Sequence, residues 1–251
     1  MGLPHTFPVT AGIWCVMRRS YFTNSYFVAS GGGLIAIDAG MKSSGGDMLA
    51  ALGELGRSPR DVRAILVTHW HNDHAAGAAE LAEVTGAPIY YHLTEAPHLS
   101  RIKASAGLRG IISRFIPETG PLVLAKGLLG NAPQRAVRAT HYVNEDQRLF
   151  DEFLVIESPG HTAGHASYYH EPTRTLFAGD ALAVIGTRLR CMARPVTEDL
   201  PTARASMLRC LDRPIDFVCP GHRQPLIHGV AQEVARFLEM LHSGTKWPFF
   251  G

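Results

Sequence analysis

The sequence is poor in cysteine. It has four among 251 residues, and their spacing fits neither a disulfide framework nor a metal-binding motif. We therefore expect reduced, buried thiols, which are typical of proteins in the reducing cytoplasm. These residues are Cys15, Cys191, Cys210 and Cys219.

The sequence also lacks a large excess of charge of either sign, and it lacks long apolar runs. The formal net charge of +2 is too small for the molecule as a whole to capture nucleic acid or a membrane surface, because such capture needs a concentrated basic field. No run of about 20 residues is apolar enough to cross a bilayer, and residues 1–14 lack the basic and apolar stretches of a secretory signal. We expect a cytoplasmic protein that binds no membrane.

What the sequence does contain is an alternation of short strands and amphipathic helices, with 46% hydrophobic residues to fill the core of one globular unit, 1–251. A strand–helix–strand rhythm in the first half predicts a parallel portion of sheet. Strands and helices recur in the second half, so we expect an α/β fold of two mixed sheets packed face to face, with helices outside. The predicted strands span 12–17, 24–29, 34–37, 63–68, 87–92, 136–143, 153–158, 166–170, 175–178 and 216–219. The predicted helices span 48–55, capped by Ser43 or Ser44, and 75–84, 202–211 and 230–241.

Residues 94–135 interrupt this pattern, because apolar and basic residues are mixed there and Glu118 is almost the only acid nearby. We interpret this segment as a helical, lid-like insert that covers a pocket. A solvated helix face and the contact surface of a homodimer are the alternatives. The basic residues in and beside the insert are Arg101, Lys103, Arg109, Arg114, Lys126, Arg135 and Arg138.

Four potential metal ligands lie within six residues, directly after the strand predicted at 63–68. Three imidazoles and a carboxylate are donors that borderline divalent cations prefer, and no hydrophobic core requires them on a loop. A solvated polar turn is the alternative, but the density of donors favours a metal site. The four residues are His69, His71, Asp73 and His74.

One short segment cannot complete two coordination spheres of about four donors each, so further ligands must come from elsewhere. Three more candidates each follow a predicted strand, in a turn that contains glycine. They are His161, Asp180 and His222. His165 lies four residues beyond His161, and we do not expect it to bind metal.

The order and the residues of these motifs resemble those of the metallo-β-lactamase superfamily, whose five metal motifs all occur here from Asp38 to His222. The resemblance implies a four-layer αββα sandwich and a place for Asp38 beside the metals. It also implies one ion held by His69, His71 and His161, a second held by Asp73, His74 and His222, and Asp180 as the bridge between them.

Two adjacent cations can share a water, lower its pKa toward about 7 and polarise the carbonyl or phosphoryl oxygen that the resulting hydroxide attacks. Asp73 and Asp180 would reduce the positive charge of the site and carry the proton, so we treat both as catalytic. Zinc is the default metal, although iron and manganese suit the same donors.

Differences between this sequence and known branches of the superfamily reduce the number of activities that we expect. The common secreted β-lactamases place cysteine where Asp180 stands, acyl-homoserine lactonases typically place tyrosine shortly after the bridging aspartate, and glyoxalase II adds a C-terminal helical extension. Here Ala181, Leu182 and Ala183 follow Asp180, and only one helix is predicted after His222. We expect hydrolysis of an ester, thioester or lactone bond in a small metabolite.

Several alternatives stay open. An iron-dependent sulfur dioxygenase would use a related scaffold and consume oxygen. A phosphodiesterase acting on nucleic acid would use the basic insert, with Arg109 and Arg114 as contacts. A β-lactamase-like hydrolase and a binding module without catalysis complete the set, and the intact donor positions argue against the last of these.

Overall fold

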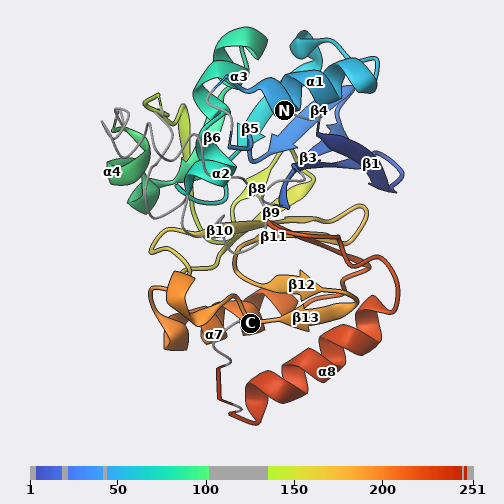
Figure 1. Cartoon of the computed structure of the whole chain (residues 1–251), viewed down its shortest axis with the longest axis vertical. Coiled ribbons are helices and arrows are strands. Elements are labelled where there is room, and N and C mark those ends of the chain that lie inside the picture. Colours follow the sequence, from blue (N-terminus) through green and yellow to red (C-terminus); the bar gives the residue numbers. More distant parts are fainter. Residues whose placement is uncertain (1–3, 19–21, 42–43, 102–134, 245, 248–251) are drawn as a thin grey trace, which may run out of the picture.

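The computed structural model describes residues 4–18, 22–41, 44–101, 135–244 and 246–247. Two main β-sheets pack face to face, and helices cover the outer face of each (Figure 1). This arrangement of helices, sheet, sheet and helices confirms the four-layer prediction. No helix among the described residues is long and apolar enough to span a membrane.

The first sheet has seven strands in chain order. Its first four strands pair antiparallel, and the pairs from β4 to β7 are parallel. The predicted parallel portion is therefore present. The strands are β1 (His5–Thr10), β2 (Ile13–Arg18), β3 (Thr23–Ser30), β4 (Gly33–Ile37), β5 (Val62–Leu66), β6 (Ile89–His92) and β7 (His141–Val143).

The second sheet has five strands in the order β14-β11-β10-β9-β8, and only the β11–β14 pair is parallel. A separate hairpin, β12 and β13, follows β11 in the chain. The strands are β8 (Arg148–Leu149), β9 (Phe153–Glu157), β10 (Ala166–His170), β11 (Thr175–Gly179), β12 (Ala183–Ile185), β13 (Arg188–Arg190) and β14 (Phe217–Pro220).

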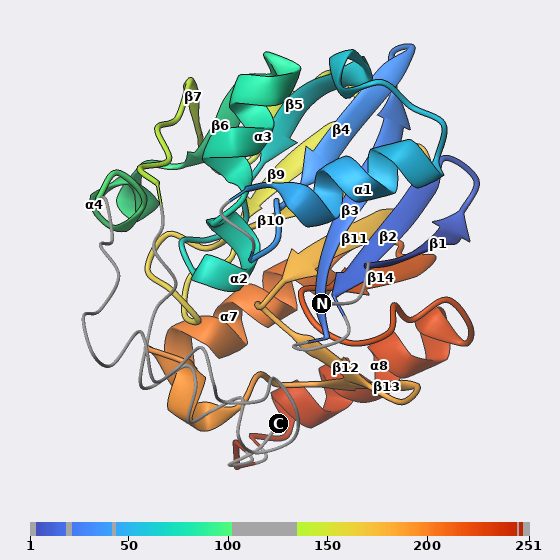
Figure 2. The ribbon, with the colours of Figure 1, turned by 45° about the horizontal axis from the view of Figure 1, so that its top comes forward.

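The longer helices lie on the two outer faces. Figure 2 shows α1 and α3 over the first sheet, with α7 and α8 on the far side of the second. The helices are α1 (Gly46–Glu54), α2 (Asn72–Ala75), α3 (Ala78–Thr85), α4 (Ala96–Leu99), α7 (Leu200–Leu211) and α8 (Val230–His242), and three short 3₁₀ turns are η1 (Pro59–Asp61), η2 (Leu93–Glu95) and η3 (Arg194–Val196).

The buried apolar residues form three cores, because successive side chains of a strand point to opposite faces of its sheet. On β3, Phe27 packs beneath the helices of the first layer, whereas Tyr26 and Val28 enter the core between the sheets. Successive side chains of a strand point to opposite faces, so a strand covered on both faces is apolar throughout. A third core joins the second sheet to α7 and α8.

Three predicted boundaries are wrong. Gly45, in a left-handed conformation with φ 61°, precedes α1 in place of a serine cap, because glycine adopts that conformation without steric cost. The helix predicted at 75–84 is two helices, since α2 ends at Ala75 and α3 begins after Gly77. The strand predicted at 136–143 forms only at its C-terminal end, as β7.

Most of the predicted insert, residues 102–134, lies outside the described residues, including Arg109 and Arg114. Arg135, counted among the basic residues of a segment with few acids nearby in sequence, has its guanidinium paired with Glu80 and Glu83 on α3. These acids are about fifty residues away in sequence, so the local composition could not reveal them.

We predict that Phe177→Ala lowers the free energy of unfolding by about 3–5 kcal/mol, because it leaves a cavity between the sheets. Phe177 is fully buried, and its ring lies 5.3 Å from the ring of Tyr26 on the opposite sheet. Val84→Ala is the control, since Val84 is 44% exposed and its loss changes stability by roughly 0.5 kcal/mol. Urea denaturation measures both variants, and equal effects contradict this account of the core.

Candidate metal centre

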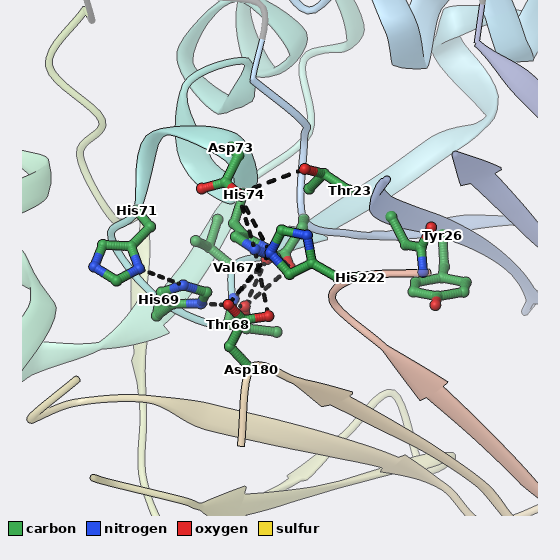
Figure 3. Close-up of polar contacts among 12 residues, drawn as sticks. Thr23, Tyr26, Val67, Thr68, His69, His71, Asp73, His74, Asp180 and His222 are labelled. Atoms are coloured by element: carbon green, nitrogen blue, oxygen red, sulfur yellow. Dashed lines mark hydrogen bonds and ion pairs between the residues drawn. The ribbon is translucent and has the colours of Figure 1, made fainter. Parts of the chain in front are cut away.

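All seven donor residues predicted from the sequence meet at one edge of the two sheets. Figure 3 labels six of them, and His161 lies against His71 and Asp180. β5 runs into the segment that carries four of them, β11 ends directly before Asp180, and β14 ends two residues before His222. His161 lies in the connection between β9 and β10. Segments far apart in sequence thus deliver their polar side chains to one place between the sheets.

Three imidazole nitrogens form the first group. His71 Nδ1 lies 3.1 Å from His69 Nε2 and 3.0 Å from His161 Nε2. A single proton can form a well-aligned hydrogen bond in only one of these two nitrogen–nitrogen contacts. The two nitrogens of the other contact then lie close together without a good hydrogen bond. Neutral imidazoles that point their lone pairs at one spot are the arrangement that a cation requires.

The surrounding hydrogen bonds assign the tautomer of His69. Thr68 Oγ1 lies 2.9 Å and 3.0 Å from the two carboxylate oxygens of Asp38 and can only donate to them. The Nδ1–H of His69 therefore donates to Thr68 Oγ1, at 2.9 Å. Its Nε2 is left with a lone pair directed at the first group, because a neutral imidazole carries one proton.

The second group consists of Asp73, His74 and His222. Asp73 Oδ2 lies 3.4 Å from His222 Nε2 and 3.8 Å from His74 Nε2. The Nδ1–H of His74 donates to Asp38 Oδ2 at 2.8 Å, so its other nitrogen faces the centre. Asp38 thus orients donors of both groups, as expected for a residue beside the metals.

Asp180 lies between the two groups. Its Oδ2 is 3.3 Å from His161 Nε2 and 3.4 Å from His222 Nε2, and its Oδ1 is 3.6 Å from His74 Nε2. One carboxylate is therefore within reach of both groups, as a bridging ligand must be.

Buried atoms of the donor residues that have no hydrogen-bond partner among the described residues include His74 Nε2 and Asp180 Oδ1, which lie 3.6 Å apart. A buried polar atom without a partner costs about 1–3 kcal/mol, and most such atoms in folded proteins are satisfied. Cations at the centre would supply the missing partners, so this donor set fits divalent metal ions.

Burial and neighbouring charges shift the pKa values in opposite directions. Burial, with His161 beside it, lowers the pKa of His71 to about 3, and burial likewise lowers the pKa of His69 and His161. Burial alone would lower the pKa of His74 too, but the carboxylates of Asp180, Asp73 and Asp38 raise it to about 10. The first group is therefore neutral and ready to bind a cation, whereas His74 must release a proton first.

Glycine is required at two positions of this edge. A Cβ on Gly221 would collide with Asp180 Oδ1 and lie 2.7 Å from the His74 ring. Gly179 has φ 49°, and a Cβ there would lie 2.6 Å from His165 Nε2. These glycines let Asp180 and its neighbours approach the backbone more closely than any other residue allows.

His165 is buried beside the centre, but both of its ring nitrogens are occupied. Nδ1 lies 2.8 Å from Ser158 Oγ, and Nε2 accepts the backbone N–H of Asp180 at 3.0 Å. His165 thus holds Asp180 in place through its backbone N–H, with both ring nitrogens engaged in hydrogen bonds.

Two threonines that the motifs did not indicate also support the donors. Thr68 does so through His69, and its place directly before His69 is the only signal in the sequence. The hydroxyl of Thr23 donates to Asp73 Oδ2 at 3.4 Å.

A family model described as the metallo-beta-lactamase superfamily matches residues 18–222. The chain belongs to this superfamily. Together with the donor groups, this membership identifies a metal-dependent hydrolase. The resemblance inferred from the motifs is confirmed.

Within the superfamily, the chain is 27% identical to a probable metallo-hydrolase of Bacillus subtilis, YflN, in an alignment of 208 residues that covers 76% of this chain and 76% of that protein. It is 29% identical to an atrochrysone carboxyl ACP thioesterase of Claviceps purpurea over 194 residues, 76% of this chain and 47% of the thioesterase. The chain thus spans about half the length of that enzyme. A solved structure titled TTHA1623 in a di-iron-bound form is 26% identical with a TM-score of 0.62, and the match covers 93% of this chain and 98% of that one.

We predict that metal binding releases protons and strengthens as the pH rises from about 6 to 8. The pKa of His74 in the metal-free protein is about 10, so His74 carries a proton over this whole range, and a cation at Nε2 must displace it. Calorimetric titration of the metal-free protein with Zn²⁺, in buffers with different heats of ionisation, measures the number of protons released. Binding that is independent of pH contradicts this account of His74.

We also predict that Asp180→Ala removes at least one equivalent of metal and lowers kcat/KM at least about 10³-fold, because a bridging carboxylate contributes several kcal/mol to the site. Elemental analysis and steady-state kinetics measure the two effects. Asp212→Ala is the control, since Asp212 is exposed at the end of α7. Unchanged metal content and rate would exclude Asp180 from the site.

Proposed function

We propose that this protein binds two divalent metal ions and hydrolyses an ester, thioester or lactone bond of a small metabolite. The observation that carries the proposal is the position of Asp180 between two groups of donors, each within 4.8 Å internally. In this proposal His69, His71 and His161 hold one ion, Asp73, His74 and His222 hold the second, and Asp180 contacts both.

Two cations held there would supply an activated water and an electrophile for the carbonyl oxygen of the substrate. The chain supplies the proton acceptor. His74 and His222 offset the effect of burial and lower the pKa of Asp73, so its carboxylate is ionised at neutral pH. Its side chain is 23% exposed, whereas Asp180 is 5% exposed, so Asp73 is the carboxylate that can pass a proton from the centre to solvent.

In the second group Asp73 and His222 are 23% and 26% exposed, whereas His74 is completely buried. In the first group His71 is half-buried and His161 is 3% exposed. We propose that a substrate approaches the centre from the side of the partly exposed donors Asp73, His222 and His71. The match to a thioesterase supports a carbonyl substrate.

We propose zinc as the default metal, since imidazole and carboxylate donors bind it well. The same donors bind iron, and the similar structure titled as di-iron-bound makes iron the first alternative. We also propose a cytoplasmic location, supported by four free cysteines that are all buried.

We predict that protein purified without added metal carries two equivalents of metal and hydrolyses at least one ester, thioester or lactone. Elemental analysis of that sample, followed by a panel of lactones, thioesters, β-lactams and phosphodiesters, tests the proposal. Treatment with a chelator abolishes the activity, and added metal restores it.

The same sample distinguishes the alternatives. Oxygen uptake with one equivalent of iron would contradict hydrolysis and indicate a sulfur dioxygenase. Turnover restricted to phosphodiesters would contradict the carbonyl substrate, and turnover of β-lactams alone would indicate a β-lactamase-like hydrolase.

A further inference from the structure

Glu95 is a buried acid that the sequence analysis did not select. It is the last residue of η2, directly before α4, and follows β6 at the edge of the sheet where the donors converge. Only 1% of the residue is exposed, and it forms no ion pair with a cationic side chain in the described part of the chain. A buried carboxylate without a counter-ion is costly unless hydrogen bonds replace its hydration.

Three donors from two different loops surround this carboxylate. Its Oε2 accepts the backbone N–H of Trp70 at 2.7 Å. Its Oε1 accepts the backbone N–H of Gly164 at 2.7 Å and the hydroxyl of Thr162 at 3.1 Å. Burial raises the pKa of Glu95, and these three hydrogen bonds oppose the rise; because backbone N–H groups face both oxygens, the arrangement suits the ionised form.

The two loops are those that carry the three-imidazole group. Trp70 lies between His69 and His71, and the pair Thr162 and Gly164 lies directly after His161. One oxygen of Glu95 thus holds the first loop, and the other oxygen holds the second.

The approach of the second loop depends on the absence of a side chain at Gly164. A Cβ there would lie 2.8 Å from Glu95 Oε1, closer than real Cβ contacts allow. Glu95 and Gly164 therefore fit each other as a pair, and the fit sets the separation of the two loops.

We propose that Glu95 is a positioning residue that fixes the His69–His71 loop relative to His161 and so sets the geometry of the three-imidazole metal group. It touches neither substrate nor the donor nitrogens, and it acts through the backbone of the loops. The proposal rests on the metal centre of the proposed function. It predicts that loss of Glu95 weakens one metal equivalent and leaves the other nearly unchanged, because Asp38 orients His74 of the second group independently.

Glu95→Gln tests this with little change in volume. Glutamine has one acceptor oxygen and one NH₂ group that donates. It can therefore accept the backbone N–H of one loop only, and its NH₂ group would point at the backbone N–H of the other loop. Glu233→Gln is the matched control, because Glu233 is also buried and also accepts a backbone N–H, that of Leu189 at 2.7 Å, but it lies on α8, outside the donor cluster.

The measurement is titration of the metal-free protein with Co²⁺, followed by its visible absorption and by competition with a chelator, with thermal unfolding recorded in parallel. We expect E95Q to bind one of two equivalents about 10–100-fold more weakly, the range typical of outer residues that orient metal ligands, with an altered spectrum for that equivalent. E233Q should lower stability without changing either affinity.

Two outcomes separate the failure of this proposal from failure of the proposed function. If the wild type binds two equivalents and E95Q binds both with wild-type affinity, the positioning role of Glu95 is wrong. If the wild type binds no Co²⁺, the proposed function is wrong. If E95Q does not fold, E95D takes its place, since a carboxylate shorter by one methylene keeps its charge but reaches only one loop; unchanged affinities in E95D overturn the proposal equally.

Discussion

The structure depends on a cluster of imidazole and carboxylate donors held closer together than their charges and lone pairs favour. His71 Nδ1 has two other imidazole nitrogens within 3.1 Å, and the carboxylates of Asp73 and Asp180 flank His222 Nε2 at 3.4 Å each. Protons cannot satisfy all of these atoms, because His74 Nε2 and Asp180 Oδ1 have no hydrogen-bond partner among the described residues. Positive charge at the centre satisfies them, and the metal chemistry proposed for this protein follows from that requirement.

The fold keeps these donors together by ending its strands at a common edge and by bracing the loops that follow. Asp38 lies after β4 in a left-handed conformation, φ 58°, which turns its carboxylate toward Thr68 and His74. Glu95 lies after β6. Two buried carboxylates therefore support the centre. Asp38 orients donors of both groups through Thr68 and His74, and Glu95 joins the two loops of the three-imidazole group. Rigid support of this kind matters because donor geometry selects the metal and its reactivity.

Most strands of the two sheets were predicted from the sequence, and so were the seven donor residues that the structure brings together, because both have local signals. The strand β10, Ala166–His170, was found with its exact bounds because it holds two β-prone tyrosines and lies between turn residues, and His69 to His74 form a dense motif. The prediction failed where tertiary contacts decide: β1 was missed because its residues are mostly exposed or half-buried, and Arg135 finds its acids on α3. Glu95 was not predicted, because a single acidic residue after a strand has no distinctive local pattern. Its partners Trp70 and Gly164 come close to it only in the folded chain.

The most direct test of the central claim is anomalous X-ray scattering from crystals of protein grown with its native metal. The account predicts two peaks on either side of Asp180, one at about 2.0–2.2 Å from the nitrogens of His69, His71 and His161 and the other at similar distances from Asp73, His74 and His222. No peak among these seven side chains, in protein whose metal content is measured as two equivalents, would contradict it.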